Sequence, residues 1–165
     1  MPDRKTIEKA RTDKRLGKSA STQAGVFVHD EIDKIRRGEH GARSTKQAIA
    51  IGLSEARRAG VDLPPPKTGK ARTRKSAEYA YEAGQGIRKP ARRPKASRAV
   101  ARALKRKPTS TVSRGALSRQ ATLAASRRSP AARAGAAKKA ARTKGAAGRS
   151  AAATKAARTR ARRRK

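Results

Sequence analysis

The chain has 165 residues, of which 46 are Lys or Arg and 11 are Asp or Glu, so its formal net charge at pH 7 is +35. One Phe and two Tyr are the only aromatic residues, which excludes a core large enough for a globule of this length. The lack of Cys excludes a disulfide framework and thiolate metal sites. At most one small helical unit fits, and we expect compact packing only within residues 22–60.

The positive charge is concentrated in the second half of the chain. Residues 67–165 carry 32 basic and 2 acidic side chains, whereas residues 1–66 carry 14 and 9. No acidic residue follows Glu82. This asymmetry predicts a near-neutral N-terminal part that folds and a basic arm that binds a polyanion. Nucleic acid is favoured over an anionic membrane surface.

Residues 1–21 form a basic N-terminal segment. Asp3 can cap a short helix that stops at Gly17. No run of apolar residues follows, so we predict neither a signal peptide nor a transmembrane helix and expect a cytoplasmic protein.

Residues 22–63 are predicted to form a helical hairpin. Apolar residues recur at helical spacing over residues 22–37, and Gly38 ends the pattern. Ser44 and Gln47 have the spacing of a capping box, which begins a second helix that ends at Gly60. Gly52 in this helix would let another helix approach closely.

The hairpin leaves the side of Ile49 and Ile51 to be covered by another element. The N-terminal helix, a helix around Tyr79 and a second copy of the chain are three alternatives that the sequence leaves open. The last of them would be a homo-oligomer formed through residues 22–60.

Residues 64–87 are predicted to be a Pro-rich linker, stiff at the three prolines 64–66, followed by a short Tyr-containing helix over residues 76–83. In the basic segment 88–130 four prolines prevent one long helix. They leave room for two short helices, at residues 95–107 and 113–128.

Residues 131–165 contain 15 Ala and 13 Lys or Arg. Ala favours helix, whereas like charges four residues apart oppose it. We predict that this Ala/Lys/Arg-rich tail is disordered when free and gains helix when phosphates neutralise it. The expected fold class is therefore mostly α, with a small N-terminal helical hairpin followed by a largely disordered basic tail with short helices.

Two resemblances add to this interpretation. Residues 46–51 read Lys-Gln-Ala-Ile-Ala-Ile, and over residues 24–66 the chain resembles an uncharacterised family of small basic bacterial proteins marked by that signature. The resemblance implies no activity, and Gly52 stands where that family has Ala. The composition of residues 88–165 is similar to the C-terminal arms of linker-histone-like and other nucleoid-associated bacterial proteins, which implies DNA condensation.

The favoured ligand of the basic arm is the phosphate backbone of duplex DNA. Proteins that bind single strands interleave aromatic residues among the cations, and the arm has none. Duplex DNA bound without sequence preference is therefore predicted, and an RNA- or ribosome-associated protein is the alternative. The predicted nucleic-acid-binding residues are Arg88, Lys89, Arg92, Arg93, Lys95, Arg98, Arg102, Lys105, Arg106, Lys107, Arg127, Arg128, Arg133, Lys138, Lys139, Arg142, Lys144, Lys155, Arg158, Arg160, Arg162, Arg163, Arg164 and Lys165.

Other functions are less favoured. A helix-turn-helix with Lys46 and Gln47 on a recognition helix would need a shorter loop than residues 38–43. His29 and His40 lie on different elements, so we predict no metal site, no cofactor and no catalytic group. An anionic lipid surface would require an apolar face that the arm lacks. We therefore expect a non-enzymatic, histone-like, DNA-compacting protein of a bacterial nucleoid or of a phage particle.

Overall fold

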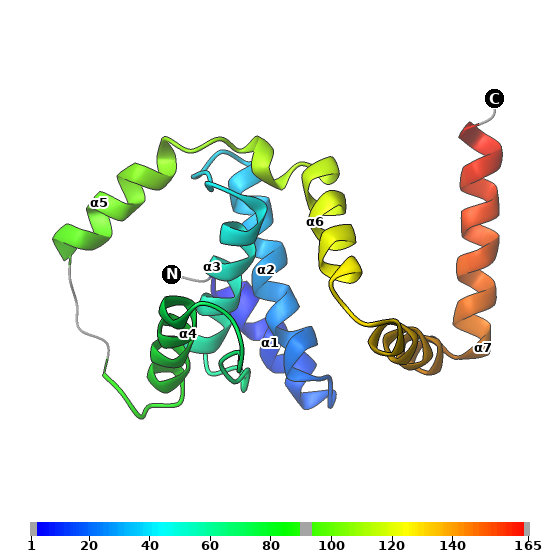
Figure 1. Cartoon of the computed structure of the whole chain (residues 1–165), viewed down its shortest axis with the longest axis horizontal. Coiled ribbons are helices and arrows are strands. Elements are labelled where there is room, and N and C mark those ends of the chain that lie inside the picture. Colours follow the sequence, from blue (N-terminus) through cyan, green and yellow to red (C-terminus); the bar gives the residue numbers. More distant parts are fainter. Residues whose placement is uncertain (1–2, 90–93, 164–165) are drawn as a thin grey trace. The chain divides into compact units, whose positions relative to one another are not determined.

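A computed structural model describes residues 3–89 and 94–163 of the chain. Within these two ranges every regular element is helical and there is no strand. The elements are α1 (Arg4–Arg15), α2 (Ala20–Arg36), α3 (Thr45–Arg58), α4 (Ala71–Gly84), α5 (Pro94–Lys105), the 3-10 helix η1 (Ser110–Val112), α6 (Arg114–Ser126) and α7 (Pro130–Arg163) (Figure 1). The chain divides into two units, which we call the head unit (residues 1–120) and the tail unit (residues 121–165).

The caps of α1 and α3 show why these two helices begin where they do. Asp3 accepts a hydrogen bond from the Lys5 amide at 3.1 Å at the start of α1. At the start of α3, Ser44 Oγ accepts a hydrogen bond from the Gln47 amide at 3.2 Å. The Gln47 side chain in turn accepts one from the Arg43 amide at 2.7 Å. These bonds satisfy amides that have no partner within the helix, and they confirm the two predicted starts.

The hairpin of α2 and α3 forms the centre of the head unit. Phe27 and Ile35 of α2 are fully buried, and α3 faces α2 with Ala48, Gly52 and Ala56, which are spaced four residues apart. A Cβ atom on Gly52 would lie 2.7 Å from Val28 Cα and 2.9 Å from Val28 N. Only glycine therefore allows the two helix backbones to approach this closely, as predicted.

Two further helices cover the hairpin. Helix α1 packs on α2, where Ala10 joins Phe27 and Val61 in one apolar cluster. Helix α4 packs on α3 and buries Ala77 and Ala80. The N-terminal helix and the helix around Tyr79 thus both serve as covering elements, and compact packing extends beyond residues 22–60, contrary to our expectation.

The segment after α5 docks on the loop between α2 and α3. Val112 of η1 is fully buried with Ile35 and Ala48. The Thr45 hydroxyl donates a hydrogen bond to the Thr111 carbonyl at 2.6 Å, and the Arg36 guanidinium donates to the Val112 carbonyl at 3.3 Å. These polar contacts fix a part of the basic segment to the hairpin.

The tail corrects the predicted fold class. Residues expected to be disordered form α7, in which Gly145 has φ 63° and ψ 179° and interrupts the helix. Figure 1 shows the interruption as a sharp break within α7. The prediction of disorder was wrong because it overweighted charge repulsion. Like charges four residues apart cost only a few tenths of a kcal/mol per pair, and Ala is the best helix former. The two short helices of the preceding segment are confirmed as α5 and α6.

None of the helices in the described part of the chain combines the length and the apolar character that crossing a membrane would require.

Candidate nucleic-acid interface

Helix α5 presents a row of cations on one face. The row consists of four predicted binding residues, Lys95, Arg98, Arg102 and Lys105. Because they are three or four residues apart, they share one side of the helix at about 5–6 Å spacing. All four side chains are exposed, and none pairs with an acidic group in the described ranges. We call this set the α5 row.

The apolar side of α5 is only partly covered. Val100 is 58% exposed, whereas Leu104 is half-buried and its carbonyl accepts a hydrogen bond from the Gly41 amide at 3.0 Å. The turn that follows contains two further predicted residues, exposed Arg106 and half-buried Lys107. The C-terminal end of α5 is therefore anchored on the hairpin loop, and the α5 row is carried by the folded head unit.

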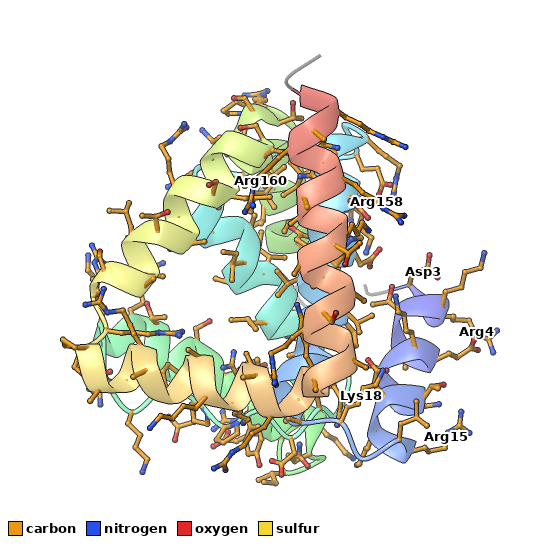
Figure 2. All side chains as sticks on the ribbon, turned by 90° about the vertical axis from the view of Figure 1, so that its right-hand side faces the viewer. Asp3, Arg4, Arg15, Lys18, Arg158 and Arg160 are labelled. Carbon is orange, nitrogen blue, oxygen red and sulfur yellow. The ribbon has the colours of Figure 1, made fainter. Side chains whose placement is uncertain are left out.

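The cations of α7 surround the helix instead of lining one face. The described and exposed ones are Arg133, Lys138, Lys139, Arg142, Lys144, Arg149, Lys155, Arg158, Arg160 and Arg162. Figure 2 shows Arg158 and Arg160 projecting on opposite sides of the last helical segment. No side chain of α7 in the described range is buried, so the helix has no apolar stripe for packing. Its surface is a set of cations supported by Ala.

The remaining predicted residues fall into three groups. Arg88 is engaged within the head unit, because its Nε donates to Glu82 at 2.7 Å and its guanidinium lies 5.3 Å from the centre of the Tyr79 ring. Lys89, Arg127 and Arg128 are exposed outside the helices, and Arg163 is the last residue of α7. The others lie outside the described residues: Arg92, Arg93, Arg164 and Lys165.

A second group of cations was missed by the sequence analysis. We name it the α4 patch; its members are Lys67, Lys70, Arg72, Arg74 and Lys75, all exposed. Most of the patch falls within residues 64–74, for which the sequence predicts a linker, whereas α4 begins at Ala71 instead of at residue 76. The signal that could have identified it is an acid-free run of cations between Asp62 and Glu78.

The head unit also buries a carboxylate. Glu31 of α2 is 1% exposed, and burial raises its pKa above the ordinary value of 4.5. The negative charge of Glu55 also raises this pKa, while His40, whose Nε2 lies 3.6 Å from the carboxylate, lowers it. Among the described residues no cluster of three or more acidic or His side chains could hold a metal ion. His29 forms an exposed pair with Asp33 at 3.0 Å.

Comparison with known proteins gives one match. Residues 5–68 match the model of a family described only as a family of unknown function (DUF6496). The matched range covers α1, α2, α3 and the Pro-rich loop, and it brings no activity to the chain. No curated protein and no solved structure matches the chain.

Proposed function

We propose that the protein binds the phosphate backbone of duplex DNA without reading its sequence, and that it compacts DNA in the nucleoid of the cytoplasm by binding, with no catalysis. The observation that carries the proposal is the exposed cationic surface of α5 and α7 in a stretch without any acidic residue. Each cation that pairs with a phosphate releases counterions, and this release supplies most of the free energy of nonspecific binding.

The α5 row suits a backbone contact. Its four cations are held at regular spacing on a helix whose C-terminal end is anchored to the hairpin. Arg98 and Arg102 can donate two parallel hydrogen bonds to one phosphate each, whereas Lys95 and Lys105 act as point charges. No base-specific contact is required of any of them, so the proposed binding is independent of sequence.

The cations of α7 suit compaction. Because they surround the helix, one side can neutralise one duplex while the opposite side faces a second duplex. A helix with a single basic face could neutralise only one. Ala between the cations keeps the helix narrow, so that phosphates can approach from every side.

The test is the salt dependence of binding to a fluorescent duplex, measured by anisotropy with the full chain from 50 to 300 mM NaCl. The logarithm of the affinity should fall steeply and linearly with the logarithm of the salt concentration. The double variant R98Q/R102Q should reduce the slope by about 1.8, at about 0.9 for each lost contact. An affinity that hardly changes with salt would contradict the proposal.

A charge-matched control separates the α5 row from net charge. The double variant R37Q/R88Q also removes two cations, but both are already paired within the protein, Arg37 with Glu39 at 2.7 Å and Arg88 with Glu82 at 2.7 Å. We expect this control to leave the slope nearly unchanged. In cells, release of the protein by DNase is expected, and release by RNase alone would favour the RNA-associated alternative.

A further inference from the structure

The α4 patch is a dense cationic surface of the head unit. Its five side chains lie within residues 67–75, a stretch that contains no acidic residue. All five are exposed, and none forms an ion pair with a residue that the structure describes. By contrast, the cations of α1 are interspersed with Asp3, Glu8 and Asp13.

The patch is carried by a packed helix. Arg72, Arg74 and Lys75 lie on the first turns of α4, and further along the same helix Ala77 and Ala80 are buried against the head. A Cβ atom on Gly84, at the end of the same helix, would collide with the Arg57 carbonyl, so α4 and α3 approach closely there. The cations therefore keep a fixed arrangement on the head unit.

The loop that leads into the patch is held at its start. The Arg57 guanidinium donates a hydrogen bond from Nε to the Leu63 carbonyl at 3.0 Å, and the Tyr81 hydroxyl donates to Asp62 at 2.7 Å. Three prolines follow and restrict the backbone further. Lys67 and Lys70 are thus confined near the three cations of α4.

The positive charge at the N-terminal end of α4 favours binding of an anion. The positive end of the helix dipole coincides with the patch, the first turn has no acidic residue, and the N-cap residue Lys70 makes no side-chain hydrogen bond to the helix. Five cations and a helix N-terminus repel one another in the free protein. A polyanion that lies along the patch reduces this repulsion by pairing with the cations that face it.

We propose that the α4 patch is a further duplex-backbone contact, distinct from the α5 row and from α7. This inference rests on the proposed function. An extended phosphate backbone fits better than a small anion, because the cations spread over a loop and two helical turns. Tyr79 carries the Arg88 guanidinium over its ring, so its stacking face is already in use and a single strand gains no base platform there.

The test compares two variants of the full chain with equal charge change. The patch variant carries K67Q, K70Q, R72Q, R74Q and K75Q, and the α1 control carries R4Q, K5Q, K9Q, R11Q and K14Q, all at exposed positions. With a 30-base-pair duplex, the patch variant should lower the salt slope by up to about 4.5, and the control by less than 1. The variant K67R/K70R/K75R, which keeps the charge, should retain the slope of the parent protein.

The outcomes separate this inference from the proposed function. If the parent protein itself shows no salt-dependent binding, the proposed function fails. If the parent binds but the patch variant and the α1 control lose equal slope, only net charge matters and the α4 patch is not a contact. The far-UV circular dichroism spectrum should show that both variants are as helical as the parent protein. If poly-glutamate displaces the protein from the fluorescent duplex as strongly as unlabelled duplex does, the patch would instead be assigned to an acidic protein.

Discussion

Glu31 is a buried carboxylate that lacks part of its hydrogen bonds in the folded head unit. Its Oε1 and Glu55 Oε2 are buried, and neither accepts a hydrogen bond from a residue that the structure describes. A buried carboxylate without a full set of donors is unfavourable, because its hydration is lost without replacement. The raised pKa of Glu31 has this cause first and the negative charge of Glu55 as a further cause.

The substitution Glu31→Gln should therefore stabilise the protein at neutral pH by about 1–2 kcal/mol. Because the folded-state pKa of Glu31 lies above 4.5, its stability contribution is fully present below about pH 4.5 and is lost as the pH rises through the raised pKa. The advantage of Gln should accordingly shrink as the pH falls from 8 to 4.5. Urea unfolding followed by circular dichroism across this range is the measurement.

The control for this prediction is Glu78→Gln on the exposed side of α4. It should change the free energy of unfolding by less than about 0.5 kcal/mol at every pH. A loss of stability in Glu31→Gln at pH 7 would mean that the attraction of the His40 and Lys34 charges to the Glu31 carboxylate outweighs the cost of burying it.

Gly52 and Gly25 make a matched pair in the hairpin. An added Cβ at Gly52 would meet the Val28 backbone at 2.7 Å, whereas at Gly25 on α2 nothing lies within 4 Å. We expect Gly52→Ala to destabilise the protein by about 2 kcal/mol, since α2 and α3 must separate. Gly25→Ala should stabilise it by up to about 1 kcal/mol through helix propensity. Equal effects in urea unfolding would show that the helices separate without cost.

The hairpin is also the part of the fold that the sequence predicts best. Local signals suffice there: Ser44 and Gln47 mark the start of α3, and Gly52 marks its close contact. The docking of η1 could not be predicted, because Val112 meets Ile35 across a long stretch of chain and no local pattern indicates the pair. The start of α4 was missed because cations in a first turn oppose the helix dipole, which is the reverse of the usual signal.

At the scale of elements, α7 shows how a charged sequence can remain helical. In its described range only Lys138 with Arg142 and Arg158 with Arg162 are like charges four residues apart. Across the break at Gly145, the Arg149 guanidinium donates a hydrogen bond to the Ala141 carbonyl at 2.9 Å. The break is thus a junction between two helical segments that the Arg149 side chain spans.

Gly145→Ala should remove this junction. The backbone conformation at Gly145 is open almost only to glycine, so Ala would be strained there by about 1–3 kcal/mol and helical continuation becomes the favourable alternative. The chain has no Cys, so labels on A132C and A157C are unique. Their backbone separation should rise to about 38 Å, the length of a straight helix of this span, in an electron spin resonance distance measurement.

Gly135→Ala is the control for this change, since Gly135 lies inside the first half of α7 with nothing within 4 Å of an added Cβ. It should raise the helix content without changing the distance between the labels. An unchanged distance in Gly145→Ala would mean that the break does not depend on glycine.

At the scale of the whole molecule, the candidate interface was only partly predictable. The α5 row could be read from spacing alone, because Arg98 and Arg102 repeat at a helical interval. The pairing of Arg88 within the protein could not be predicted in this way, because it depends on how the fold brings Arg88 to Glu82 and Tyr79. Composition identifies a polycation, but only the structure separates paired cations from exposed ones.

Because exposed cations lie on both units, one molecule should link two duplexes. An immobilised duplex loaded with the full chain should capture a second, fluorescent duplex. Capture should be highest when protein is limiting and should fall when excess protein saturates both duplexes separately, which is the signature of bridging. Higher salt should abolish capture before it releases the protein from the first duplex, because the bridged state uses only part of the cations for each duplex.

The tail unit should be essential for this bridging. A variant with R133Q, K138Q, K139Q, R142Q and K144Q removes the cations of the first half of α7 and leaves the head unit intact. Per molecule bound to the first duplex, we expect its capture of the second to fall at least fivefold, because the tail unit loses five of its 15 Lys and Arg residues and each lost phosphate contact weakens binding. The α1 control, with the same loss of charge, should capture as much as the parent protein. Equal capture by the α7 variant and the parent would show that the five cations of the first half of α7 are not needed for bridging.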